Sequence, residues 1–297
     1  SECLVGSEMC IRDRYAHVVK GRIDALAALL ANPAVDYTTP LNSGVYNVFH
    51  AVGLCQDLSA QRQMLAMLEE KWPPGHPAWS SRKNWGESVM SDVYHFQWYQ
   101  DRGCPVNEVT SEGRSLLSQV VLGNHSRTTP ETRANGMALF DHLRKEITSC
   151  QGLLQVELAW QSAVLGVHVE MMEKILSLGL VKVNALMVGP APPSTDLPLP
   201  RKGRDPAYAV LNHYRSYGSP TSRPRFDRAF DAMHRHGLDW GVNPDPDRYD
   251  SRHAMMVGLL GAETADPWYQ ALRARSREHA LNAGLPVAVG FTPSLRF

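Results

Sequence analysis

Two histidines, His234 and His236, are the residues of this 297-residue sequence that most resemble part of a metal site. They close an expected helix in the segment RPRFDRAFDAMHRHG. Side chains two residues apart leave a helix on different faces, whereas a helical zinc pair needs a spacing of four. Cationic side chains at that position also interact favourably with the helix dipole. We therefore expect helix-end residues here and no metal site.

His50 and Cys55 could form a base and a thiol nucleophile if folding brought them together. A buried cysteine, however, behaves as a small apolar residue with little reactivity. The sequence contains no GxSxG, P-loop, GxGxxG or HExxH motif. We expect a protein that is not an enzyme and needs no cofactor, and a hydrolase that uses Cys55 or Cys104 is the alternative.

The charge balance argues against several classes of partner. Lys and Arg together number 30, as do Asp and Glu, so the formal net charge is zero. A neutral chain lacks the basic footprint of a protein that binds nucleic acid or an anionic membrane surface. No apolar run approaches the roughly 18–20 residues of a membrane helix. Cysteines are few and show no disulfide pattern. We expect a cytoplasmic protein, or one that is secreted into a host cell.

The segment LAWQSAVLGVHVEMMEKILSLGLVKVN, residues 158–184, predicts two short helices. The first helix is expected at residues 158–165, with Gly166 after it, and the second at residues 168–178, with Gly179 after it. Val169, Met172 and Ile175 recur at helical spacing, as does Leu176, and define one apolar face. A helix–turn–helix unit of this size buries its apolar face only against neighbours of the same kind.

The same pattern recurs along the chain and resembles the ankyrin-repeat family. Phe49-His50-Ala51-Val52 resembles the family's L-H-x-A motif, in which the histidine bonds neighbouring backbone. Segments that contain Gly and end in Val-Asn close several of the units. The units are spaced unevenly and more widely than the 33 residues or so of a standard repeat. The resemblance implies an all-α solenoid of degenerate ankyrin-like helix–turn–helix repeats. Other helical repeats and a closed bundle are the alternatives.

The domain organisation follows from these patterns. Residues 4–13, LVGSEMCIRD, resemble a translated sequencing-library adapter, so we expect residues 1–14 to be a non-native segment. We also expect a metagenomic, bacterial source. Residues 15–288 form the expected repeat array, which includes a long proline-rich loop at 185–204. Residues 289–297 form a C-terminal tail.

The architecture predicts the function, because ankyrin-like stacks bind proteins through the turns between repeats and through their concave face. Loops on a rigid scaffold are where recognition is usually built. The expected partner is a protein, and the expected contact residues in or beside these turns are Tyr37, Arg114, Trp240 and Tyr249. The alternative is the recognition part of a larger bacterial host-directed effector whose catalytic domain is missing.

Overall fold

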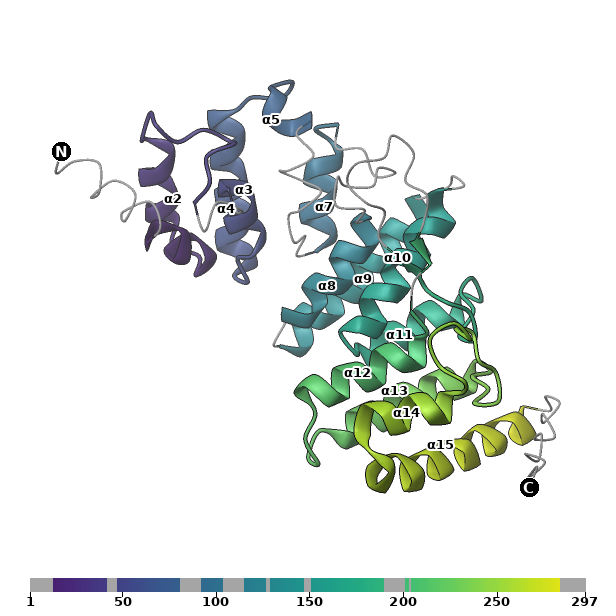
Figure 1. Ribbon diagram of the computed structural model, residues 1–297. Coiled ribbons are helices and arrows are strands. Elements are labelled where there is room, and N and C mark those ends of the chain that lie inside the picture. Colours follow the sequence, from purple (N-terminus) through teal and green to yellow (C-terminus); the bar gives the residue numbers. More distant parts are fainter. Residues whose placement is uncertain are drawn as a thin grey trace, which may run out of the picture. The chain divides into compact units, whose positions relative to one another are not determined.

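The computed structural model describes residues 13–41, 47–80, 92–103, 115–126, 129–146, 151–189, 201–202 and 204–283. Helices form nearly all of the regular structure (Figure 1), which confirms the predicted all-α class. None of the helices in these residues is long and apolar enough to span a membrane. The chain divides into two compact units, Ser1–Gly152 and Leu153–Phe297.

The first unit contains a helical stretch at residues 13–19 and seven labelled elements in the described segments. These are α2 (Ile23–Leu30), α3 (Val48–Gly53), α4 (Leu58–Lys71), α5 (Pro77–Ser80), α7 (Val93–Gln100), α8 (Leu116–Ser126) and α9 (Pro130–Glu146). Helix α4 packs against α2 and α3, and α9 packs against α7 and α8. An aromatic cluster fills part of the core and contains Phe49, Trp72, Trp79, Trp98 and Tyr99.

His50 bonds neighbouring backbone at the start of α3. The backbone N–H of Asn47 donates to His50 Nδ1 at 3.4 Å, and the Asn47 side chain accepts from the backbone N–H groups of Phe49 and His50. This reciprocal capping box satisfies donors at the start of α3 that the helix itself leaves unpaired. Burial lowers the pKa of His50 to about 4, so the imidazole stays neutral and can accept.

Most of the segment predicted to be adapter-derived, residues 1–14, lies outside the described residues, as does the tail at 289–297. Asp13 and Arg14 begin the helical stretch at 13–19. The Arg14 guanidinium donates to the Ala28 carbonyl at 3.1 Å.

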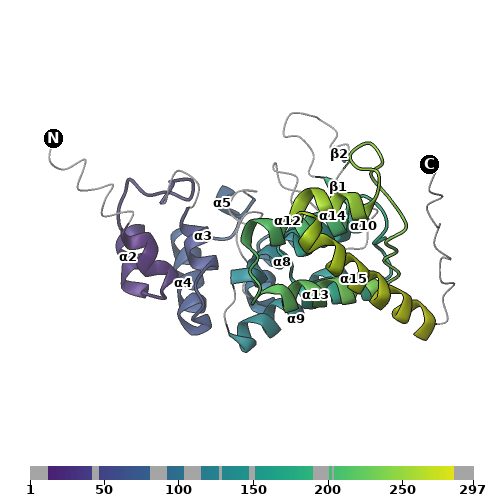
Figure 2. The same cartoon turned by 60° about the horizontal axis from the view of Figure 1, so that its bottom comes forward.

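The second unit contains α10 (Gln151–Leu165), which begins at the boundary between the units, and α11 (Val169–Ser177), α12 (Pro206–Tyr217), α13 (Arg223–Arg235), α14 (Arg252–Leu260) and α15 (Ala262–Asn282). Helix α13 packs between α11 and α15, while α12 packs against α13 and α14. Figure 2 shows α12 and α14 on one side and α13 and α15 on the other.

Helix α11 follows the sequence prediction closely. Met172, Ile175 and Leu176 are buried, as is Met171, whereas Val169 is half-exposed. Gly179 ends this segment with a φ of 68°, a conformation that costs glycine little because it has no Cβ. Helix α10 ends at Leu165, as predicted. It begins at Gln151, seven residues before the predicted start at Leu158, so it is longer than expected.

The proline-rich insertion at 185–204 has an ordered base. Strand β1 (Val188–Gly189) pairs antiparallel with β2 (Arg201–Lys202), with Val188 opposite Lys202. The Met187 N–H also donates to the Arg204 carbonyl at 3.0 Å. The two ends of the insertion therefore lie side by side, a pairing that the sequence analysis did not predict.

Candidate functional site

A buried ion pair joins the residue that follows the insertion, Asp205, to Arg252. Arg252, the first residue of α14, and Asp205, the residue before α12, both have fully buried side chains. The guanidinium Nε and Nη2 each donate to one carboxylate oxygen at 2.9 Å, which is the bidentate arrangement that fixes both groups in one geometry. Asp205 also accepts from the Ala207 N–H and caps α12.

Asn184, which closes the α10–α11 pair, links Arg252 to the segment that follows α13. Its Oδ1 accepts from Arg252 Nη1 at 3.1 Å and from the Asp239 N–H at 3.0 Å. Its Nδ2 donates to the Gly237 carbonyl at 2.7 Å. Asn184 and Asp205 are the residues immediately before and after the insertion. Both ends of the insertion are therefore attached to Arg252.

Two tyrosines cover the ion pair. The Tyr249 hydroxyl donates to Asp205 Oδ2 at 2.9 Å, and its ring stacks on that of Tyr208, with centroids 6.4 Å apart and planes 6° apart. Burial and the adjacent Asp205 carboxylate both raise the pKa of Tyr249 well above its usual value. Tyr249 therefore remains a hydrogen-bond donor, and its ring is held in a fixed orientation.

Two exposed arginines flank Tyr208. The guanidinium carbons of Arg204 and Arg248 each lie 5.7 Å from the Tyr208 ring centroid, within cation–π range. Arg248 Nε also lies 3.6 Å from Asp245. Arg204 forms no ion pair within the part of the chain that the structure describes. We call Arg204, Tyr208, Arg248 and Tyr249 the Tyr208 surface.

The predicted contact residues have different outcomes. Tyr249 belongs to the Tyr208 surface. Trp240 was wrongly expected at the surface, because its side chain is 3% exposed and its indole N–H donates to His234 Nε2 at 2.8 Å. Tyr37, in the first unit, is half-buried and packs edge-on against Trp72 and His76. Arg114 lies outside the described residues.

Arg204, Tyr208 and Arg248 were not predicted as contact residues from the sequence. Tyr208 lies within a helix rather than in a turn, so a search for aromatic residues in turns does not reach it. The available signal was the position of Arg204 at the end of the predicted 185–204 loop and of Arg248 next to Tyr249, since arginine is common at interfaces.

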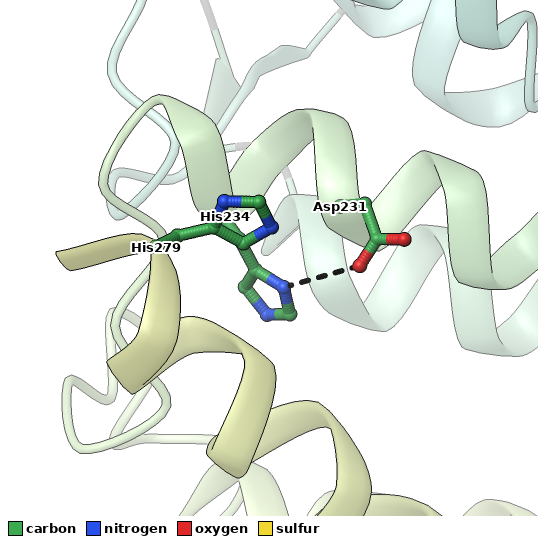
Figure 3. Close-up of side chains that lie close together, drawn as sticks. All are labelled: Asp231, His234 and His279. Atoms are coloured by element: carbon green, nitrogen blue, oxygen red, sulfur yellow. Dashed lines mark ion pairs between the residues drawn. The ribbon is translucent and has the colours of Figure 1, made fainter. Parts of the chain in front are cut away.

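Asp231, His234 and His279 form a second cluster (Figure 3), and the sequence analysis had paired His234 with His236 instead. Their nearest ligand atoms lie within 4.8 Å of one another, and His234 Nδ1 is 3.8 Å from Asp231 Oδ1. Burial, with nearby cationic groups, lowers the pKa of His234 to about 3, so the ring is neutral.

The hydrogen bonds oppose metal binding at this cluster. His234 Nε2 accepts from the Trp240 indole, so the single proton of the neutral ring lies on Nδ1, the atom that faces Asp231. A metal needs that nitrogen unprotonated. The Asp231 carboxylate is also paired with Arg275, whose Nη1 lies 3.2 and 3.3 Å from its two oxygens. Within this cluster His234 serves as the hydrogen-bond acceptor of Trp240, and the protonated Nδ1 and the Arg275-paired carboxylate disfavour a metal ion.

His50 and Cys55 do not form a nucleophile and base. The His50 Nδ1 accepts from the Asn47 N–H, while the Cys55 thiol is buried and donates to the Asp57 carbonyl at 3.4 Å. Burial raises the pKa of the Cys55 thiol, which keeps it protonated and unreactive near neutral pH. Cys104 lies outside the described residues.

No family model, curated protein or solved structure matches this chain. The functional assignment therefore depends on the chain's own residues.

Proposed function

We propose that this chain is a non-catalytic protein-interaction module, built from degenerate ankyrin-like repeats, that binds a protein partner through the Tyr208 surface and the adjacent turns. One observation carries the proposal: residues at both ends of the 185–204 insertion bond the fully buried Arg252, and Tyr249, which bonds Asp205, stacks on Tyr208 beside two exposed arginines.

The contacts between helices support a repeat array in the second unit. Helix α13 contacts α11 on one side and α15 on the other, and α12 contacts α14. Such contacts between equivalent helices are what stacking of helix pairs produces. Asn184 also hydrogen-bonds the closing segment of the next helix pair, at Gly237 and Asp239. The recurring Asn of the closing segments thus has a physical role at this junction.

The composition and rigidity of the Tyr208 surface support a role in binding. Tyrosine and arginine are over-represented among residues that contribute most to protein interfaces. The Tyr249 ring is fixed by its hydrogen bond to Asp205 and by Tyr208, so less side-chain freedom is lost when a partner binds. Loops carried on a fixed base are also the usual location of recognition sites.

A random-peptide library displayed on phage tests the proposal, because such a selection does not require an identified partner. The immobilised full chain should enrich peptides whose binding is weakened by Tyr208→Ala. Tyr217→Ala is the matched control, because Tyr217 lies on the same helix, is 78% exposed and is outside the Tyr208 surface. If the enriched peptides bind the Tyr208→Ala variant as tightly as the unaltered chain, the proposed binding surface is wrong.

A further inference from the structure

We propose that the Tyr208 surface recognises an acidic peptide segment, one that carries Asp or Glu side chains spaced to meet Arg204 and Arg248. This inference rests on the proposed function and specifies the chemistry of its partner.

The placement of the two arginines is the first support. Each guanidinium carbon lies 5.7 Å from the centroid of the same Tyr208 ring, so the two are no farther apart than twice that distance. Both side chains are exposed, and each can offer the planar fork of N–H donors that matches a carboxylate. A short peptide with two acidic side chains can span that separation, because an extended chain rises about 3.3 Å per residue.

The state of the neighbouring carboxylates is the second support. Asp205 is buried and already accepts from Arg252 and Tyr249, so it does not neutralise the surface arginines. Asp245 is 5% exposed and faces Arg248 only at 3.6 Å. Asp247 and Asp250 are the exposed acids of the same turn.

Peptide fits this surface better than other polyanions. The formal net charge of the chain is zero, whereas nucleic-acid binding relies on an extended basic surface. The parallel rings of Tyr208 and Tyr249 provide an apolar contact beside the two cations. An acidic peptide can contact both features. The methylene groups and backbone of its acidic residues can pack on the rings, and their carboxylates can pair with the arginines.

Charge reversal in the peptide selection tests this inference. The unaltered chain should enrich peptides rich in Asp and Glu, and Arg204→Glu/Arg248→Glu should instead enrich peptides rich in Lys and Arg. For one synthetic peptide from the first selection, fluorescence anisotropy should show affinity falling about tenfold or more in the doubly reversed variant, since like charges across an interface are strongly unfavourable. Affinity should also fall as NaCl is raised.

Arg228→Glu is the matched control, because Arg228 is an exposed arginine of the same unit that lies outside the Tyr208 surface. It should leave both the enriched composition and the affinity unchanged. Circular dichroism at 222 nm checks that the variants fold, and single Arg204→Ala and Arg248→Ala variants, each expected to weaken binding severalfold, provide a milder second test.

The outcomes separate the two proposals. Peptides that depend on Tyr208 but carry no acidic residues would overturn the acidic-peptide inference and leave the proposed function standing. Acidic peptides that bind the charge-reversed variant unchanged would overturn it as well. If Tyr208→Ala weakens none of the enriched peptides, both proposals fail.

Discussion

Replacing Arg252 should destabilise the second unit more than almost any other single substitution. Arg252→Met keeps an unbranched side chain of similar length but leaves the Asp205 carboxylate buried without its counter-ion. Removing one partner of a buried ion pair costs about 3–5 kcal/mol, because the remaining charge is uncompensated. The variant also loses the hydrogen bonds from Arg252 Nη1 to Asn184 and to the Asp239 carbonyl.

A second variant separates the uncompensated charge from lost packing. Asp205→Asn keeps an oxygen that can accept from the Ala207 N–H and so preserves the cap of α12. In Arg252→Met/Asp205→Asn no charge remains buried, so the double variant should be more stable than Arg252→Met alone. Urea unfolding followed at 222 nm gives the free energies, and hydrogen exchange of the α12 and α14 amides assigns the loss to this unit.

The two measurements also define a contradictory result. An exposed ion pair contributes at most about 1 kcal/mol to stability. If Arg252→Met lowers the free energy of unfolding by less than that, Arg252 does not pair with a buried carboxylate. If the double variant is less stable than the single one, the cost arises from packing and not from the charge left behind.

Three further outcomes follow from the described contacts. Met172→Asp places a charge at a fully buried position of α11 and should cost several kcal/mol in urea unfolding, whereas the same change at the exposed Leu180 should cost little. Asn184→Ala should cost about 1–3 kcal/mol in the same assay, because the Gly237 carbonyl and the Asp239 N–H lose their partner. His234 has a folded pKa of about 3 against an ordinary value of 6.5, so the unfolded state takes up the proton first and stability declines as the pH falls from about 6.5 towards 3. His234→Gln should therefore lose less stability between pH 7.5 and pH 5 than the unaltered chain, and an identical loss would mean that His234 is not buried in its neutral form.

Residues typical of helix ends predicted several of the helices from the sequence. Gly166 and Gly179 bracket α11 because glycine is suited to helix ends, and Pro130 begins α9 because its missing N–H has no intrahelical partner at that position. His50 bonds the backbone N–H of Asn47, three residues earlier. These features depend on residues close together in the sequence, so spacing alone reveals them.

The site depends on contacts that sequence spacing does not contain. Arg252 meets Asp205 across 47 residues, and Trp240 meets His234 from the following turn. Trp240 was expected at the surface because it lies beside a turn, yet a bulky ring with a polar N–H is equally suited to a buried position with one acceptor. The pairing of β1 with β2 was hidden by the prolines of the insertion, which exclude helix but not a short antiparallel base.

The most direct test of the proposed function is a hydrogen-exchange footprint of a peptide from the selection bound to the full chain. Binding through the Tyr208 surface should slow exchange in residues 204–217 and 243–252, with little change in α11. Protection centred on the outer residues of α11, such as Glu170 and Glu173, with none at the base of the insertion, would contradict it.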